Sequence, residues 1–368
     1  MLILLDRETH YGDFYVPAFS VRMGGRDLVR DRFLTIPSVE VDLKLKAAGR
    51  FSFSVANAFD LTKREFVAGE DGAEVDLLEL FRLGAEVEIR MGYGEPARLP
   101  LIMLGLVTEL GSSFSNGVPE LRIAGFDKLY KLGKSNQPRH WEDSRDSDVV
   151  SDLANRQGIR ADAERTDPEK TRIEKGQETD LKFIEKLAKR NSATFYMRGD
   201  RMKFGPRNND LDQVLTMEWG KGLLSFDPEA NLAEQVSRVE LVGWSPQNAQ
   251  PIVGLSDRGD QSGQESGRRG GGDHVAEALG ETTLYIRQPV HSQAEADTRA
   301  RAVREERAEK FITASGECIG LPEVLPDTNL GLGGLGRLFS RVYYVEQATH
   351  AIGADGYKTR FKVQETTL

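Results

Sequence analysis

The segment from Glu178 to Pro206 constrains the fold most, because it specifies one amphipathic helix and one hairpin. Thr179 is suited to cap the helix, and Asn191 to end it. The apolar positions between them recur at helical spacing: Leu181, Ile184, Leu187 and Ala188. The β-rich ATFYM then reaches the turn Arg198-Gly199-Asp200 and returns as RMKFGP. We predict a small α+β module that packs its own apolar face and carries out no reaction.

The first part of the chain, up to about residue 130, alternates with the period of two that is typical of half-buried strands. One face carries Val39, Val41, Leu43 and Leu45, and the other carries Ser38, Glu40, Asp42, Lys44 and Lys46. The stretch Val75 to Leu83 predicts a short helix ended by Gly84. A long hairpin follows, with its turn at Asn116-Gly117.

The C-terminal end repeats this long hairpin. RVYYVEQATHAIG rises to Asp355-Gly356, and YKTRFKVQE returns. Val107 lies nine residues before Asn116, and Val345 lies ten residues before Asp355. The hairpin format alone could produce this spacing, but we favour two copies of one barrel.

We therefore expect a mainly β, overall α+β chain: two antiparallel β-barrel domains with a small α+β module between them. The expected boundaries are 1–135 for the first barrel, 136–207 for the module and 208–368 for the second barrel. Ser147 is expected to cap a helix in DVVSDLANRQ, with Gly158 after its end.

Two features interrupt the second barrel. The glycine-rich stretch 256–273 predicts a flexible excursion. Ser292 and Glu295 form a capping box for a polar helix over 292–310, which we expect to be mostly solvated and to cover little core. Its opposite charges four residues apart are Glu295 with Arg299, Asp297 with Arg301 and Glu306 with Lys310.

Charge and cysteine content limit the function classes. The 368 residues include 49 Lys and Arg against 58 Asp and Glu, a net charge of −9, which argues against a general nucleic-acid binder. Cys318 is the single cysteine, so neither an intrachain disulfide nor a cysteine metal cluster can form. MLILL is too short for a signal peptide, and no stretch approaches the ~20 apolar residues of a spanning helix. We expect synthesis in the cytoplasm and no direct membrane insertion.

Motifs for chemistry are weak. Gly331, Gly333 and Gly336 match G-x-G-x-x-G, but Leu325-Pro326-Asp327 precedes them and SRVYYV follows, which favours a turn over a dinucleotide site. The five histidines have no metal-ligand spacing: His10, His140, His274, His291 and His350. We predict no catalytic, cofactor-binding or metal site, and we expect His350 to be packed or to face a lumen.

Four stretches together resemble the phage late-control protein D family, the baseplate hub of contractile tails and related injection systems. They are MGYGEPARLPLIMLGLVTEL, LRIAGFDKLYKL, ETDLKFIEKLAKRNSATFYMRGDRMKFGP and GLGRLFSRVYYVEQATHAIGADGYKTRFKV. The hub part of the valine-glycine repeat spike proteins of type VI secretion is related. The resemblance covers most of the chain in order.

This resemblance implies a homotrimer, made in the bacterial cytoplasm, in which each chain supplies two tail-tube-like β-barrel domains to a pseudo-sixfold ring. Such a ring joins a hexameric inner tube protein to a trimeric spike protein, with baseplate wedge proteins around it. The chain ends at Leu368, directly after the expected second barrel, so a separate spike is implied. No inserted lysozyme-like domain is expected.

For ring building we favour the segments 36–46, 99–125 and 339–365, which include the long hairpins and open strand edges. Two other functions stay open. One is a tail-associated peptidoglycan-degrading enzyme, which requires a buried carboxylate pair in a cleft. The other is a secreted carbohydrate-binding β-protein or adhesin, which requires a signal peptide.

Overall fold

The computed structural model describes residues 16–70, 73–114, 117–208, 212–245, 249–257, 268–290 and 292–368. The MLILL run, His10, Asn116, His291 and most of the glycine-rich excursion, 258–267, lie outside these ranges. The chain is mainly β with some helices, as the alternating patterns predicted.

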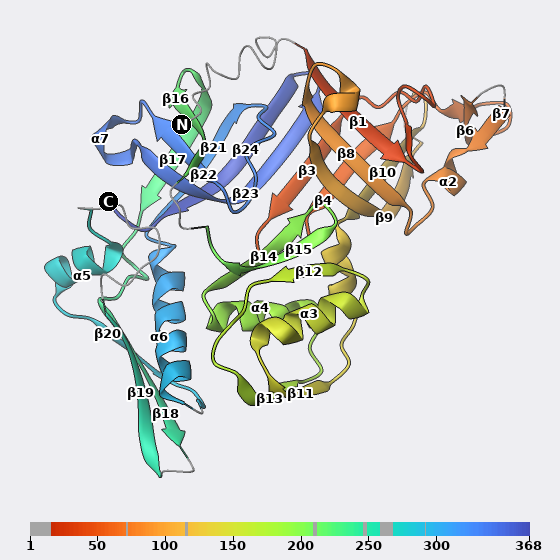
Figure 1. The fold of residues 1–368 in the computed structure, drawn as a ribbon. Coiled ribbons are helices and arrows are strands. Elements are labelled where there is room, and N and C mark those ends of the chain that lie inside the picture. Colours follow the sequence, from red (N-terminus) through yellow and green to blue (C-terminus); the bar gives the residue numbers. More distant parts are fainter. Residues whose placement is uncertain are drawn as a thin grey trace.

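Most strands belong to one sheet that runs across the whole molecule (Figure 1). Its described strands lie in the order β2 (Arg26–Asp27), β1 (Pro17–Met23), β8 (Glu86–Tyr93), β9 (Leu101–Ser113), β10 (Glu120–Phe126), β4 (Arg50–Val55), β3 (Val39–Lys44), β23 (Arg341–Gly353), β22 (Asn329–Gly333), β16 (Gln213–Trp219), β17 (Gly222–Ala230), β21 (Ile312–Ile319) and β24 (Gly356–Glu365).

Six of these strands close into a barrel, because β23 pairs with β24 as well as with β22. The barrel is mixed, since β16 runs parallel to both β22 and β17. The prediction that this barrel is antiparallel throughout is therefore wrong. The second predicted barrel is not shown. In the described residues no pairing closes the strands from β1 to β3, and the second edge of β3 pairs with β23.

The two ends of the sheet have separate apolar cores. In the first, Phe51 lies over Gly105 and Gly125, and a Cβ atom at either glycine would come within 2.5–2.7 Å of the Phe51 ring. The barrel core includes the buried residues Leu223, Tyr343 and Phe361. Ring packing and burial of this kind are the main stabilising contribution at each end.

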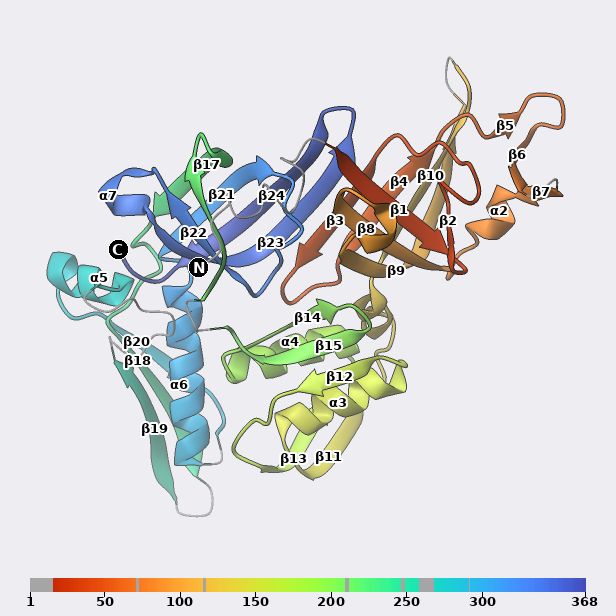
Figure 2. The ribbon, with the colours of Figure 1, turned by 45° about the horizontal axis from the view of Figure 1, so that its top comes forward.

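The region between the two ends in sequence is an α+β module that lies below the sheet (Figures 1 and 2). Its elements are η3 (Lys128–Gly133), β11 (Arg139–Ser144), α3 (Asp146–Arg156), β12 (Arg160–Ala163), β13 (Lys170–Lys175), α4 (Asp180–Arg190), β14 (Ala193–Arg198) and β15 (Arg201–Pro206). The predicted helix and hairpin are confirmed. Thr179 Oγ1 accepts a hydrogen bond from Lys182 N (3.3 Å), and Gly199 takes φ +61° at the turn.

The helix α3 begins earlier than predicted. Arg145 occupies the N-cap position, and Asp148 accepts from the Arg145 N–H (3.0 Å). Ser147 lies inside the first turn, where its N–H donates to Thr166 Oγ1 (3.0 Å). Gly158 has φ +70°, in agreement with its predicted position after the helix.

A third layer lies beside the module, below the barrel (Figures 1 and 2). It consists of β18 (Arg238–Ser245), β19 (Gln250–Asp257), α5 (Gly271–Leu279), β20 (Thr283–Arg287) and α6 (Gln293–Ala308). The prediction that the polar helix covers little core is wrong. Ala296 and Ala300 of α6 pack against the sheet, and Gly254 lets the helix backbone approach so closely that a Cβ atom there would lie 2.3 Å from Ala296 O.

Buried charges join α6 to the module. Lys170 donates to Asp146 (2.6 Å) and lies 3.8 Å from Glu295, which pairs with Arg299 at 2.7 Å, as its spacing predicted. Burial lowers the pKa of Lys170. Two charged side chains from α6 thus fill a polar core, and Glu306 pairs across the same boundary with Lys189 (3.3 Å).

A small arm projects from the other end of the sheet. It contains β5 (Phe59–Asp60), β6 (Glu65–Glu70), β7 (Ala73–Asp76) and α2 (Leu77–Leu80). The helix predicted from Val75 is shorter because Asp76 is its N-cap and accepts from Leu78 N (2.8 Å). Gly84 has φ +87°, as predicted. Two further short helices are η2 (Pro96–Arg98) and α7 (Gly336–Phe339).

Candidate assembly surface

The strands β3 and β23 form the joint between the two ends of the large sheet. They run antiparallel, with Asp42 opposite Thr349 and Glu40 opposite Ala351. Because β3 also pairs with β4 and β23 also pairs with β24, the joint is continuous with both ends. The two strand sets are therefore held in one fixed relative orientation by backbone hydrogen bonds.

Polar side chains reinforce the joint on one face. Asp42 Oδ1 accepts from Gln347 Nε2 (2.7 Å) and from Thr349 Oγ1 (2.8 Å). Arg360 reaches across β23 and donates to Glu40 (2.7 Å). Charge-assisted hydrogen bonds of this kind favour one register over its neighbours.

The same face is hollowed on both sides of the joint. One hollow of about 710 Å³ lies over β4, β10 and the β23–β24 hairpin, and another of about 540 Å³ lies over β3, β17, β21 and β24. Both are lined by Glu40, Arg50, Glu317 and Arg360. Acidic and basic groups alternate along this face, and they pair with one another, as Arg50 does with Glu109 (3.3 Å).

Asp327 fixes the other side of the joint to the module. Its carboxylate accepts from the hydroxyls of Tyr344 (2.7 Å) and Tyr196 (2.9 Å) and from Asn208 N (2.9 Å). Burial raises the pKa of both tyrosines, with the Asp327 carboxylate acting in the same direction. One aspartate thus connects the barrel, the hairpin β14–β15 and the chain after it.

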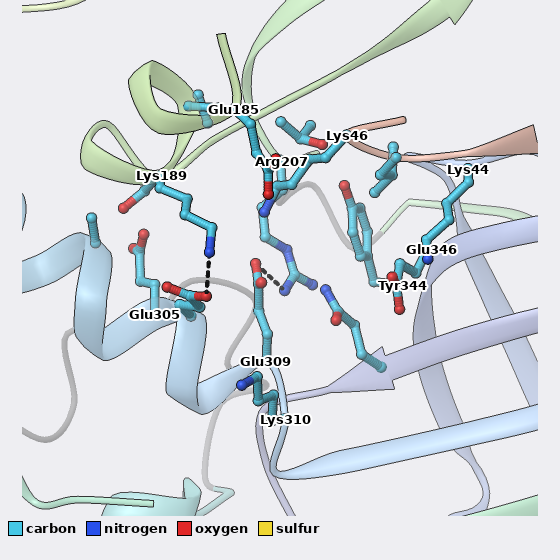
Figure 3. A pocket seen from close by; sticks show the side chains of 18 of the residues that line it. Lys44, Lys46, Glu185, Lys189, Arg207, Glu305, Glu309, Lys310, Tyr344 and Glu346 are labelled. Carbon is cyan, nitrogen blue, oxygen red and sulfur yellow. Dashed lines mark hydrogen bonds and ion pairs between the residues drawn. The ribbon is translucent and has the colours of Figure 1, made fainter. Parts of the chain in front are cut away.

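A cavity of about 370 Å³ opens where the joint, the module and α6 meet (Figure 3). The Arg207 guanidinium stacks over the Tyr344 ring at 4.1 Å and lies 3.8 Å from Glu309. The lining includes five basic residues, Lys44, Lys46, Lys189, Arg207 and Lys310, and five acidic ones, Glu185, Glu305, Glu306, Glu309 and Glu346. Two ion pairs between separate elements lie at this junction, Lys189 with Glu306 and Arg207 with Glu309.

The favoured ring-building segments occupy the joint and the hairpins. Segment 36–46 contains β3, 99–125 contains β9 and most of β10, and 339–365 contains β23 and β24. The structure brings the first and third together inside one chain. Both edges of β3 are therefore used internally, while the contribution of these segments to contacts between chains stays a prediction.

Sequence reasoning missed Asp327, Arg207 and Tyr344 as junction residues. Asp327 has φ +63°, a backbone conformation in which Asp and Asn are enriched, but no motif around it indicates a junction residue. Arg207 follows Pro206 at the end of the predicted hairpin and could have been considered as a residue of the module boundary.

The three histidines that the structure describes lie in separate elements: His140 in β11, His274 in α5 and His350 in β23. His350 is fully buried, and its ring hydrogen-bonds to Tyr357 Oη (2.9 Å) and Val324 O (3.0 Å), which confirms the packed interpretation. Burial lowers its pKa from 6.5 to about 4. His140 is exposed on β11. Within the described ranges no three His, Cys, Asp or Glu side chains are grouped closely enough to hold a metal ion.

The glycine motif lies at the end of β22. Gly331 and Gly333 belong to the strand, Gly334 and Gly336 have φ +74°, and the helix that follows, α7, has four residues. A helix this short provides a much weaker phosphate site than the long helix of a dinucleotide-binding fold. Of the helices that the structure describes, none combines the length and apolar character needed to cross a membrane.

Solved structures identify the class of fold. The 43 kDa tail protein of prophage MuSo2 from Shewanella oneidensis matches with a TM-score of 0.67 and 13% identity, over 94% of this chain and 98% of that one. A tail protein from Neisseria meningitidis MC58 matches with a TM-score of 0.67 and 16% identity, over 95% and 97%. The chain has the fold of phage tail proteins.

A type VI secretion component also has a fold similar to that of this chain. The E. coli c3393 protein, described as structurally similar to the T4 bacteriophage tail proteins gp27 and gp5, matches with a TM-score of 0.56 and 10% identity, over 93% of this chain and 76% of that one. The resemblance to baseplate hub proteins is thus confirmed at the level of the fold.

The chain belongs to the family described as the Alg8 N-terminal domain, whose sequence model matches residues 60–354. That description names a domain and not an activity. No curated protein matches the chain.

Proposed function

We propose that the chain is a structural baseplate hub subunit of a phage tail or contractile injection particle. Three copies form a pseudo-sixfold ring that joins a hexameric inner tube to a separate trimeric spike. The observation that carries this proposal is the β3–β23 joint, which fuses two strand sets into one sheet and so gives each chain two fixed building units.

The domain division follows from the same proposal. Residues 1–135 form the first tube-like unit, 136–207 the connecting module and 208–368 the second unit with its insertion. Support comes from three apolar clusters that largely follow this division. Ile352 and Tyr357 of the second unit also pack in the first cluster, and Leu129 and Leu132 of the first unit pack in the module. Three such chains present six related units to the tube and three copies of the module to the spike.

The two long hairpins provide the rim for the tube. Both β9–β10 and β23–β24 point to the same side of the sheet, away from the module (Figure 2). A tube subunit that stacks on this side meets two similar hairpins from each chain. The module and the third layer lie on the opposite side, where they are placed to contact a spike and the surrounding wedge proteins.

We propose that the chain has no enzymatic activity of its own. A peptidoglycan hydrolase requires an acid with a raised pKa beside a second carboxylate in a cleft. Three acids along the two hollows have basic partners: Glu40 pairs with Arg360, Glu109 with Arg50 and Glu317 with Lys358. No observation in the described residues favours the hydrolase or the adhesin.

Sedimentation equilibrium of the purified chain tests this function. We expect a species with three times the mass of one chain that binds tube protein at one end. The variant Asp162→Ala, on the exposed outer strand of the module, is the control and should sediment as the unmodified chain does. A chain that stays monomeric at micromolar concentration, alone and with its tube protein, would rule the proposal out.

A further inference from the structure

Five strands of the first end recur in the barrel in the same order. The run β8-β9-β10-β4-β3 corresponds to β22-β23-β24-β21-β17, both in space and along the chain. Each long hairpin has a β-bulge directly after a valine, at Val107 in β9 and at Val345 in β23. Bulges re-aim a strand at a defined residue, so they fix how the two runs align.

Backbone hydrogen bonds around Val107 and Val345 support the same alignment. Val107 N donates to Ala85 O (2.9 Å) and Val107 O accepts from Gly84 N (2.7 Å). Val345 N donates to Thr328 O (2.9 Å) and Val345 O accepts from Asp327 N (3.1 Å). Gly84 and Asp327 both have positive φ, +87° and +63°. The alignment therefore holds residue by residue.

Carried through the sheet, the alignment makes β17 the counterpart of β3. Ile123 of β10 and Phe361 of β24 correspond, and they pair with Phe53 and Gly316 respectively. These in turn face Val39 of β3 and Phe226 of β17. The acids of β3, Glu40 and Asp42, thus correspond to Asp227 and Glu229.

The two corresponding strands, β3 and β17, differ in whether another strand pairs with their outer edge. The outer edge of β3 pairs with β23 over residues 347–352. Beyond Leu223, the outer edge of β17 has no strand partner among the described residues, and the same holds for β9 after Val107. Leu45, which follows β3, is 6% exposed, whereas its counterpart Leu232 is 37% exposed.

We propose that β17 of one copy pairs with β9 of the next copy, antiparallel and in the register of the β3–β23 joint. Gly111 lies opposite Glu229, and Ser113 lies opposite Asp227. This inference rests on the proposed ring and names the surfaces that build it. One copy offers β17 and the other offers β9, so the contact is head-to-tail and repeats until the ring closes.

Side-chain chemistry supports the pairing of β17 with β9 of the next copy. Asp227 reaches Arg122 across β9 as Glu40 reaches Arg360 across β23. Glu109, in the position of Gln347, is neutralised by Arg50 at 3.3 Å. Exposed apolar side chains flank both edges: Leu224, 48% exposed, lies on β17, and Leu83, 66% exposed, lies next to Gly84 beside β9.

Pro228 removes one hydrogen bond from this pairing. It corresponds to Val41 and lies opposite Ala314 of β21. Asn231 N donates toward β21, to Phe311 O (2.8 Å), so the backbone groups of residue 228 point outward by alternation. Because proline has no N–H, the new ladder lacks the donor that Val41 provides in β3, and its other bonds come from the remaining outward-pointing residues of β17.

Paired cysteines test the register. Gly111→Cys combined with Glu229→Cys places two thiols opposite each other across the proposed contact. The backbone groups of these two residues point away from the contact, and in such a pair the Cα atoms approach to about 4.5 Å, which a disulfide can span. A Cβ atom at Gly111 meets nothing within 4 Å, and Cys318 is buried, so the fold tolerates the change. Gly111→Cys with Asp227→Cys, two residues out of register, is the matched control.

Mild oxidation should give covalently linked trimers with the first pair and at least about tenfold less product with the control. A chain that sediments as a trimer but does not cross-link overturns the register and leaves the proposed function intact. A chain that stays monomeric overturns both.

A charge exchange provides an independent readout. Arg122→Asp should weaken the trimer by about tenfold in dissociation constant, and adding Asp227→Arg should restore it. Arg160→Asp, in the exposed module strand β12, is the control and should leave the constant unchanged. Failure of the second substitution to restore assembly also contradicts the pairing.

Discussion

The pH dependence of stability should depend on His350. The ring is fully buried between β23 and β24, and its Nε2 faces the carbonyl oxygen of Val324 at 3.0 Å. A carbonyl only accepts, so Nε2 carries the proton and Nδ1 accepts from Tyr357 Oη or Thr359 Oγ1. A second proton on Nδ1 would create a buried charge without a carboxylate partner in these contacts.

The magnitude follows from the pKa of His350. Burial lowers this pKa from 6.5 to about 4 in the folded chain. The unfolded chain therefore binds the proton more readily, so the contribution of neutral His350 is fully present above pH 6.5. It is lost as the pH falls from 6.5 to about 4, and the loss amounts to about 3 kcal/mol at roughly 1.4 kcal/mol per pH unit.

Urea denaturation of the chain and of His350→Asn, followed by circular dichroism at pH 8, 5 and 4, measures this loss. The variant is less stable at pH 8 by about 1–3 kcal/mol, because buried hydrogen bonds are lost. The difference between the two proteins should shrink as the pH falls. His140→Asn, at an exposed strand position, should follow the unmodified chain. A difference that stays constant from pH 8 to pH 4 would show that His350 does not cause the loss of stability in acid.

Two further substitutions test the packing. Gly254→Val places side-chain atoms against the α6 backbone at Ala296, so the free energy of unfolding should fall by about 1–3 kcal/mol in urea denaturation, and an unchanged midpoint would contradict the close approach. Lys175→Met leaves Asp180 buried without its 2.8 Å partner and should lower the free energy of unfolding by about 3–5 kcal/mol. The control Arg172→Met, on the exposed face of the same strand, should change it by less than about 1 kcal/mol. Equal effects of the two substitutions would contradict a buried ion pair.

The local pattern of the chain was predictable to a large extent. Alternation from Val39 onward predicted β3, and helical spacing with Thr179 as the cap predicted α4 and the hairpin after it. These predictions depend only on residues that are close in sequence, because the spacing of apolar side chains indicates which of them are buried. The same reasoning predicted the left-handed conformation of Gly84.

The assembly of the elements was less predictable. The pairing of β3 with β23 joins edges about 300 residues apart, and alternation cannot specify which distant edge a strand meets. Charge pairs on α6 indicated a solvated helix, yet its alanines face the sheet and Glu295 is buried with Lys170. Small side chains make such a face hard to recognise. The helix α5 was missed because its first residues, Gly271 and Gly272, read as part of a loop.

The candidate assembly surface was predictable only as segments. The three favoured segments contain the joint strands and both long hairpins, but the polar contacts of Asp42 and the carboxylate contacts of Asp327 depend on partners that lie far away in sequence. The bulges at Val107 and Val345 were visible only as similar hairpin spacings.

Cryo-electron microscopy of the purified assembly would show the number of chains and the number of lobes in one measurement. We expect a ring of three chains with six similar lobes, in which each joint within a chain alternates with a β17–β9 contact between chains. A ring of six chains, or a trimer whose chains meet through the module with separated sheets, would contradict this expectation.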